Sequence, residues 1–276
     1  MHPLEQAAIS LRRSPIFKNA EPLWRAARPM YARVLRRWKR TGLERCINGT
    51  DRVLIAPELY NMPEEYEPDV WRQVMGAAPS GGVVVDVGAY IGLYAIALAQ
   101  RVGPKGKVYA FEPEPNTFKR LQQHIHLNNV QSQVQLWPCA VGEHSGSASF
   151  LSGRSSESHL ASTADETSVT GGITVQVVTL DEVLDDTAVA LLKVDVEGFE
   201  EGVLRGAARL LNNKKRAPRA IFIEVHPFNW ESANTTSESL LQLLDGYGYE
   251  VFDMQGARVQ HIVKYGEIVA RRKESQ

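Results

Sequence analysis

The stretch that most constrains the fold runs from residue 83 to residue 99. It begins with three consecutive valines and continues as a run too apolar for a strand with one face in water. A glycine-containing turn follows at residues 88–92, and then an apolar run compatible with a helix. The pattern predicts a buried strand, a loop and a helix whose first free N–H groups point toward whatever lies above the strand. This part of the chain is therefore expected to hold a ligand.

The turn discriminates between nucleotide-type ligands. Gly88 and Gly92 permit a positive φ or the close approach of a ligand to the backbone. The dinucleotide fingerprint G-x-G-x-x-G requires a second glycine where Tyr90 stands, so a pyrophosphate on this turn is disfavoured. The chain has no G-x-x-x-x-G-K-[ST] segment for a phosphate loop. The pattern that remains, Asp86-x-Gly88-x-x-x-Gly92, resembles the first motif of S-adenosylmethionine-dependent methyltransferases.

Composition restricts the class of protein. The 276 residues are 43% apolar and 23% charged, which suits a globular chain of one large or two small domains. No apolar run approaches the ~20 residues that span a bilayer. The first residues lack the apolar core of a secretory signal, and two cysteines, Cys46 and Cys139, fit a reducing compartment. We therefore expect a cytoplasmic protein.

The N-terminal stretch differs from the rest of the chain in charge. Residues 1–40 hold ten Lys or Arg against two Glu, whereas the remainder is mildly acidic. Apolar residues recur here at helical spacing, with an interruption at Pro29. We expect a basic helical extension over residues 1–47, followed by one catalytic domain over residues 48–276. The extension suits an anionic membrane, a carrier protein or nucleic acid, or is a solvated helical face.

Strand-like and helix-like runs alternate along the catalytic domain, which predicts an α/β fold with a mostly parallel sheet. Residues 148–178 interrupt this order with a polar, Ser- and Thr-rich stretch between two strand-like runs, and predict an inserted hairpin that acts as a substrate lid. Just before residue 69, Tyr66 and Glu67 are candidates to cover the cofactor or substrate. A continuous helix is expected over residues 199–211. The expected strands cover residues 53–56, 83–87, 107–111, 134–137, 191–195, 220–225, 249–254 and 267–271.

Candidate site residues collect at the carboxyl ends of the expected strands, the edge at which parallel sheets bind ligands. Glu112 lies 20 residues beyond Gly92, where a carboxylate is positioned to accept both hydroxyls of a ribose. Asn116 is expected either to contact the ligand or to cap the helix that follows. The other strand ends carry Ala140, Asp195, Glu197, Glu224 and His226.

Six segments, taken in order, closely resemble the FkbM family of methyltransferases. They are residues 85–92, 111–116, 140–143, 179–184, 193–200 and 223–227. The resemblance covers residues 50–270 and leaves out the basic extension. It implies a Rossmann-like, seven-stranded methyltransferase sheet with an antiparallel last strand and helices on both faces. It also implies O-methylation, with S-adenosylmethionine as donor, of a small-molecule hydroxyl on a natural product such as a macrolide or polyketide, or on a sugar.

The resemblance assigns cofactor contacts position by position. It implies that Gly88 and Gly92 form the loop around the methionine moiety and that Glu112 accepts the ribose. Asp195 would lie near the sulfonium. Tyr90 stands where many relatives carry a small polar residue, often Asn. The remaining expected contacts are Asp86, Ala89, Tyr90, Pro113 and Asn116, with Cys139 and Ala140 at the adenine.

The reaction needs a group that takes a proton, because an alcohol is a poor nucleophile until it is deprotonated. His226 is the first candidate because its ordinary pKa suits a base near neutral pH, and Glu197 is the next. Asp195 and Glu224 stand at neighbouring strand ends. The alternative is that Asp195, Glu197 and Glu224 gather a divalent cation that acidifies the hydroxyl. This spacing is not diagnostic of a metal site, so a side-chain base is favoured.

Three rival functions are weighed against this one. A nicotinamide-dependent oxidoreductase shares the glycine turn and the acidic strand end. A base-modifying N-methyltransferase is disfavoured, because residues 195–198 read Asp-Val-Glu-Gly in place of an Asn/Asp-Pro-Pro-aromatic clamp. A non-catalytic protein would use the same fold to dock a carrier or nucleic acid through residues 1–40.

Overall fold

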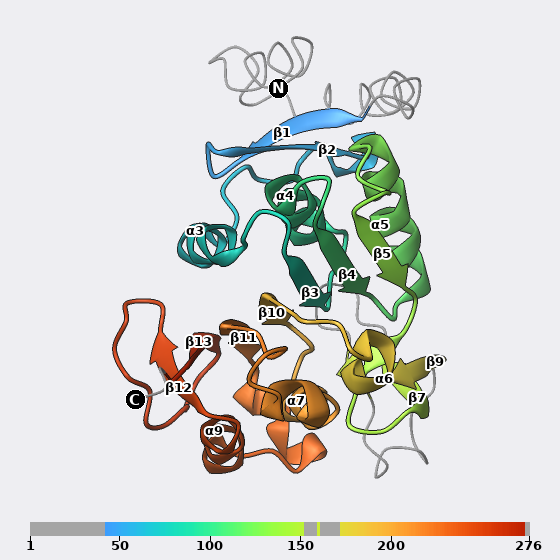
Figure 1. The fold of residues 1–276 in the computed structure, drawn as a ribbon. Coiled ribbons are helices and arrows are strands. Elements are labelled where there is room, and N and C mark those ends of the chain that lie inside the picture. The colour runs from blue at the N-terminus through green and yellow to red at the C-terminus, as the bar shows by residue number, and fades with distance from the viewer. Residues whose placement is uncertain (1–41, 152–158, 161–171, 274–276) are drawn as a thin grey trace, which may run out of the picture.

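A seven-stranded sheet forms the centre of the protein, seen in a computed structural model that describes residues 42–151, 159–160 and 172–273 (Figure 1). Its strand order is β12-β13-β11-β10-β3-β4-β5, with β13 antiparallel to both neighbours and the pairs from β11 to β5 parallel. This confirms the predicted sheet. The strands are β3 (Val83–Val87), β4 (Lys107–Phe111), β5 (Val134–Trp137), β10 (Leu191–Val194), β11 (Ala220–Val225), β12 (Tyr249–Asp253) and β13 (Gly266–Arg272).

Helices cover both faces of the sheet (Figure 1). Side chains of β3 alternate between the two faces: Val84 packs with α3, α4 and α5, whereas Val85 and Val87 pack with α6 to α9. Asp86 therefore shares the face of Val84. One face carries α3 (Pro68–Ala77), α4 (Leu93–Val102) and α5 (Pro115–Leu127); the other carries α6 (Leu180–Leu184), α7 (Glu200–Arg205), α8 (Ala208–Asn212) and α9 (Ser237–Gly246).

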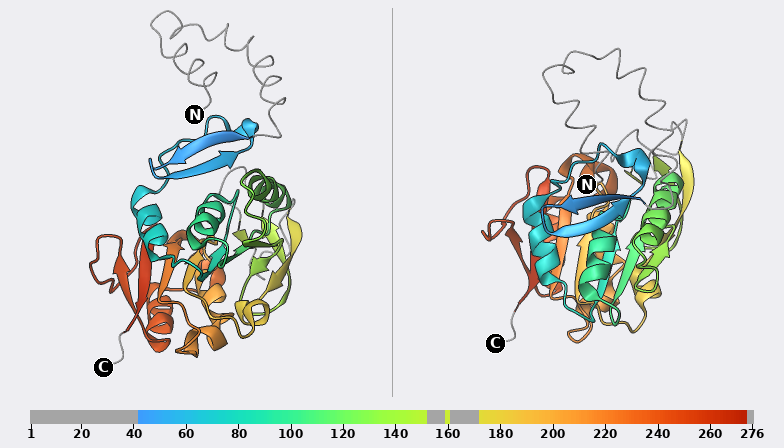
Figure 2. Two further views of the ribbon diagram at one scale, coloured as in Figure 1. Left: turned by 45° about the horizontal axis from the view of Figure 1, so that its top comes forward. Right: turned by 90° about the horizontal axis from the view of Figure 1, so that it is seen from above.

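A two-stranded ribbon precedes the main sheet and lies over α4 and α5 (Figure 2). Strands β1 (Leu43–Ile47) and β2 (Asp51–Ile55) pair antiparallel. Residues 43–47 were expected to belong to the helical extension, and this is wrong. The reason is the turn between the strands, where Asn48 and Gly49 have positive φ values of 49° and 72° and reverse the chain. The basic residues 1–40 lie outside the described part of the chain.

A second sheet is built from the region of the predicted insertion. Strands β6 (Ala140–Val141), β7 (Gly146–Leu151), β8 (His159–Leu160) and β9 (Ile173–Val178) lie in the order β6-β9-β7-β8. The two strand-like runs that flank the polar stretch pair antiparallel, as β7 and β9. The parallel pairing of β6 with β9 was not predicted. Residues 152–158 and 161–171, where the lid was expected, are not among those described.

The expected helix over residues 199–211 is two helices. A Cβ atom on Gly206 would lie 2.0 Å from the carbonyl oxygen of Gly142, so the chain between α7 and α8 packs directly against another backbone segment. Short 3-10 helices, η1 (Pro57–Leu59) and η2 (Pro227–Ala233), complete the regular elements. Within residues 42–151, 159–160 and 172–273, no helix combines the length and apolarity that crossing a bilayer requires.

Candidate functional site

The loop after β3 is shaped by contacts within the protein. Gly88 has a φ of 81°, and a Cβ there would lie 1.7 Å from the carbonyl oxygen of Asp195 at the end of β10. Gly92 has a φ of 90°, and its Cβ would lie 2.4 Å from Cδ1 of Leu121 in α5. The sequence predicted a positive φ or the close approach of a ligand at both glycines, and both have the positive φ. Close packing of the loop on its neighbours is a further reason, which was not predicted.

Glu112, directly after β4, organises the same loop. Its Oε2 accepts the N–H of Tyr90 at 3.0 Å and its Oε1 accepts the N–H of Glu114 at 2.8 Å. Burial raises the pKa of Glu112 to about 8, although the hydrogen bonds from the two N–H groups act in the opposite direction and lower it. Each carboxylate oxygen can accept a second hydrogen bond. Glu112 therefore fixes the loop and keeps acceptor capacity for a ligand.

A pocket opens beside this loop, between the start of α4 and the end of β10, and Asp86 lines it. The Asp86 side chain is fully buried, and neither carboxylate oxygen has a hydrogen-bond partner among the residues that the structure describes. Burial raises the pKa of Asp86 to about 6, and the nearby Lys193 ammonium opposes this shift. Because buried carboxylates without partners are rare, Asp86 marks a place that suits a ligand with hydrogen-bond donors.

Lys193 is a buried residue of this pocket that the sequence analysis did not single out. Its Nζ donates to Oδ2 of Asp195 at 3.0 Å and lies 4.7 Å from the centre of the Tyr94 ring. Burial disfavours the ammonium, but the carboxylates of Asp195 and Asp86 outweigh it and raise the Lys193 pKa. The sequence feature that could have indicated this buried lysine is its position inside the otherwise apolar strand β10.

Of the two residues singled out before α3, Tyr66 lines this pocket, and Glu67 contacts the pocket residue Tyr94. The ring centre of Tyr66 is 6.1 Å from that of Tyr94. The hydroxyl of Tyr94 donates to Oε2 of Glu67 at 2.7 Å. Asn48 in the β1–β2 turn anchors the segment, because its side chain bonds both the N–H and the carbonyl of Tyr66, at 2.9 and 2.7 Å. Their covering role stays a prediction.

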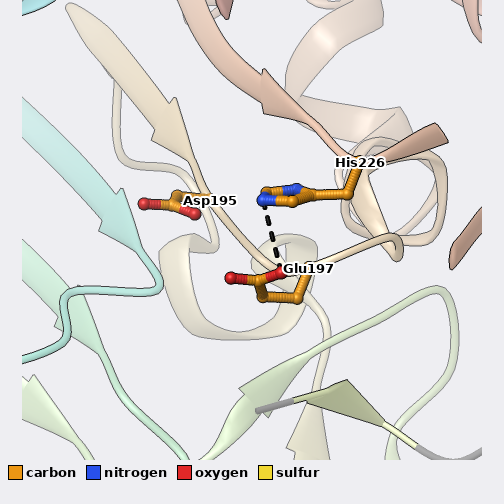
Figure 3. A group of neighbouring side chains, drawn as sticks. All are labelled: Asp195, Glu197 and His226. Atoms are coloured by element: carbon orange, nitrogen blue, oxygen red, sulfur yellow. Dashed lines mark ion pairs between the residues drawn. The ribbon is translucent and has the colours of Figure 1, made fainter. Parts of the chain in front are cut away.

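A second cluster surrounds His226, directly after β11. In Figure 3 the side chains of Asp195, Glu197 and His226 converge from neighbouring strand ends. The Nε2 of His226 lies 3.3 Å from Oε2 of Glu197 and 3.7 Å from Oε1 of Glu224. Burial disfavours the imidazolium, but the hydrogen bond to Glu200 and the charge of Glu197 outweigh it, so the His226 pKa is raised. The structure thus brings together all four predicted catalytic side chains.

The cluster also bears on the metal alternative. Asp195, Glu197 and His226 each offer one ligand atom, and these atoms lie within 4.8 Å of one another, a spacing that a divalent cation can bridge. The predicted cation set had Glu224 in place of His226. Glu224 instead accepts a hydrogen bond from the hydroxyl of Tyr265, and burial raises its pKa to about 8.

Residues 86–251 match the family model described as the methyltransferase FkbM domain. The chain belongs to the FkbM methyltransferase family. The matched region of this FkbM-family chain begins at Asp86 in β3 and ends in β12, so it contains the His226 cluster and every residue that lines the pocket except Tyr66. The resemblance drawn from the six sequence segments is confirmed.

Relatives of this FkbM-family chain are matched over part of their length. It is 30% identical over 165 residues to the hexuronic acid methyltransferase AglP of Haloferax volcanii, covering 58% of this chain and 62% of AglP. It is 32% identical over 149 residues to Methyltransferase 1 of Beauveria bassiana, covering 46% and 59%. The chain thus spans about three fifths of the length of these relatives. The crystal structure of the FkbM methyltransferase from Methylobacillus flagellatus is 19% identical with a TM-score of 0.45, covering 78% of this chain and 53% of that one.

Of the eleven expected cofactor residues of this FkbM-family chain, six line the pocket and five do not. Asn116 is exposed, and the helix α5 is capped by Glu114, whose Oε2 accepts the N–H of Thr117 at 2.6 Å, so the capping role expected of Asn116 is wrong. Burial raises the pKa of the Cys139 thiol to about 11. The pocket lining includes Asp86, Gly88, Ala89, Tyr90, Gly92 and Asp195, and does not include Glu112, Pro113, Asn116, Cys139 or Ala140.

Proposed function

We propose that this FkbM-family protein is an S-adenosylmethionine-dependent O-methyltransferase that acts on a hydroxyl group of a small molecule. The observation that carries the proposal is the buried Asp86 carboxylate, which has no hydrogen-bond partner in the described protein and lies in the pocket beside the glycine loop. The methionine end of the donor carries an ammonium group, which supplies the hydrogen bonds and the positive charge that Asp86 lacks. The family membership and the similarity to other methyltransferases support methyl transfer as the reaction class.

The residues that would hold the cofactor follow from their chemistry. Asp86 would bind the ammonium, and the free N–H groups at the start of α4 would face the methionine carboxylate. Glu112 would accept ribose hydroxyls with the lone pairs that the loop N–H groups leave open. Cys139 and Ala140 would contact the adenine. When bound, S-adenosylmethionine supplies an electrophilic methyl group.

The His226 cluster would take the proton of the acceptor hydroxyl. Nε2 of His226 is the nitrogen that faces the carboxylates of Glu197 and Glu224. The charge of Glu197 and the hydrogen bond to Glu200 would stabilise the imidazolium that forms when Nε2 receives the proton. Asp195, hydrogen-bonded to Lys193, lies between the pocket and this cluster and would orient the acceptor near the transferred methyl group.

The proposed reaction is tested with S-adenosylmethionine labelled in its methyl group. Pairs of sugars and macrolides are compared in which one member has a free hydroxyl and the other has that hydroxyl already methylated. We expect the label only in members with the free hydroxyl, and in an ether linkage by mass spectrometry. Label found on nitrogen of amino-group analogues, with none on oxygen, would instead support an N-methyltransferase.

Replacing Glu112 with Ala is expected to weaken S-adenosylmethionine binding about 10- to 100-fold, because leaving buried polar groups without a hydrogen-bond partner costs roughly 1–3 kcal/mol. Calorimetric titration measures the affinity. Glu114→Ala is the matched control, since it removes a neighbouring carboxylate whose hydrogen bonds stay within the first turn of α5. Equal affinities for Glu112→Ala and wild type would remove Glu112 from the cofactor site.

Methyl transfer is expected to be unchanged by EDTA, because Nε2 of His226 can take the hydroxyl proton without a metal ion. The rate is measured after gel filtration into EDTA, and again after addition of Mg²⁺ or Mn²⁺. A rate that is lost in EDTA and restored by either cation would contradict the side-chain base and favour a metal at Asp195, Glu197 and His226.

A further inference from the structure

Glu200, the first residue of α7, is fully buried, and three nitrogen atoms lie within hydrogen-bond distance of its carboxylate group. Its Oε1 accepts the N–H of Gly198 at 2.9 Å and lies 2.9 Å from Nδ1 of His226. Its Oε2 accepts the indole N–H of Trp230 at 2.8 Å. An ionised carboxylate only accepts hydrogen bonds, so it bonds all three nitrogens together only when Nδ1 of His226 carries a hydrogen.

We infer that Glu200 is a positioning residue that holds the His226 imidazole with its proton on Nδ1 and turns Nε2 toward the reacting hydroxyl. This inference rests on the proposed function of His226 as the proton acceptor. The two imidazole nitrogens have distinct roles, and the hydrogen bond made by one decides what the other can do. Glu200 would thus act through His226 without touching the substrate.

Glu200 also fixes the turn that carries Glu197. Glu197 has a positive φ of 53°, and Gly198 follows with a φ of 109°. A Cβ on Gly198 would lie 2.4 Å from Cβ of Asn229, so this turn is packed tightly against η2. Because Glu200 accepts the N–H of Gly198 and bonds His226, one carboxylate sets both partners of the 3.3 Å ion pair.

Other groups face His226 on its remaining sides. The carboxylates of Glu197 and Glu224 lie on the Nε2 side, with Asp195 from the end of β10 close by. The ring centre of Tyr265, from the segment between β12 and β13, lies 5.3 Å from that of His226, and the ring of Phe228 packs edge-on at 5.7 Å. Loss of Glu200 would therefore act on the Nδ1 side of His226 directly, and on the Nε2 side only through the turn that carries Glu197.

Glu200→Gln tests the inference because an amide cannot satisfy three donors. If the amide oxygen faces His226 and Gly198, its NH₂ group opposes the indole N–H of Trp230. If the oxygen faces Trp230, the NH₂ group forces Nδ1 to accept a hydrogen bond, and the proton moves to Nε2. Adding Trp230→Phe removes the competing donor, so the double variant regains the Nδ1–H form and still lacks the negative charge.

The primary measurement is NMR of the full chain labelled with ¹⁵N-histidine and bound to S-adenosylhomocysteine. In wild type and in the Trp230→Phe control we expect His226 protonated at Nδ1. In Glu200→Gln we expect a mixed or inverted tautomer and a titration moved to lower pH, because a negative charge that favours the imidazolium is gone. In the double variant we expect the proton of His226 to return to Nδ1, while His226 still titrates at a lower pH than in wild type. If Glu200→Gln does not fold, the double variant alone carries the test of the titration.

Wild-type tautomer and titration in both Glu200 variants would overturn the inference and leave Glu200 a purely structural residue. The kinetic counterpart is a kcat at least 10²-fold lower for Glu200→Gln, since a misplaced proton removes most of a general base's contribution of roughly 10²–10⁴-fold. The KM for S-adenosylmethionine should not change. If the NMR changes occur in a protein that methylates no hydroxyl, the proposed function fails and the positioning of His226 by Glu200 stands.

Discussion

Replacing His226 with Ala lowers kcat for methyl transfer by about 10²- to 10⁴-fold, the usual contribution of a general base, and leaves the affinity for S-adenosylmethionine unchanged. The variant removes the nitrogen that faces Glu197 at 3.3 Å. The pocket that contains Asp86 does not include His226 in its lining, so cofactor binding should persist. Single-turnover kinetics with labelled donor measure the chemical step, and calorimetry measures the affinity.

The control for this variant is His126→Ala, which removes an exposed histidine on α5. Glu197→Gln provides the second arm, because it keeps the size of the side chain and removes the charge that stabilises the imidazolium. We expect His126→Ala to keep the wild-type kcat and Glu197→Gln to reduce it. Wild-type rates in both His226→Ala and Glu197→Gln would show that neither residue takes the proton.

Gly88→Ala is expected to lower the free energy of unfolding by about 2–4 kcal/mol and to abolish cofactor binding. The added Cβ would lie 1.7 Å from the carbonyl oxygen of Asp195, a contact that only backbone movement can relieve. A φ of 81° adds conformational strain for any residue with a side chain. Moving the loop away from β10 would also displace Asp86 and open the pocket.

Gly103→Ala separates these two effects. Gly103 has a similar φ of 70°, but a Cβ there meets no atom within 4 Å. Gly103→Ala should therefore lose only about 1–2 kcal/mol of stability through strain and keep the wild-type affinity. Chemical denaturation measures the free energy of unfolding of both variants. Equal losses for Gly88→Ala and Gly103→Ala would mean that the contact with Asp195 does not shape the loop.

The core of the fold was predictable because local pattern and tertiary packing agree there. Residues 107–111 form β4 with the predicted bounds, and the apolar run at residues 83–87 forms β3. The predictions that were wrong concern segments whose structure depends on contacts distant in sequence or on backbone geometry. The break at Gly206 depends on Gly142, which the helical pattern of α7 and α8 does not reveal. The β1–β2 ribbon depends on a positive φ at Asn48.

The candidate site was predictable to the extent that its residues stand at strand ends. Asp195, Glu197 and His226 come together for that reason. Lys193 lies inside a strand and Glu200 inside the first turn of a helix, where a charged residue usually faces solvent. Their burial is a property of the packed fold, so residue type and spacing alone do not reveal it. The packing role of Gly88 is hidden for the same reason.

Calorimetric titration of the wild-type chain with S-adenosylmethionine and with NADH distinguishes a methyltransferase from a nicotinamide-dependent oxidoreductase. We predict binding of one S-adenosylmethionine per chain and no heat with NADH. We also predict at least tenfold weaker S-adenosylmethionine binding in Asp86→Asn, because the buried negative charge that would pair with the ammonium is removed. Heat with NADH and none with S-adenosylmethionine, from a chain that circular dichroism shows to be folded, would contradict the account.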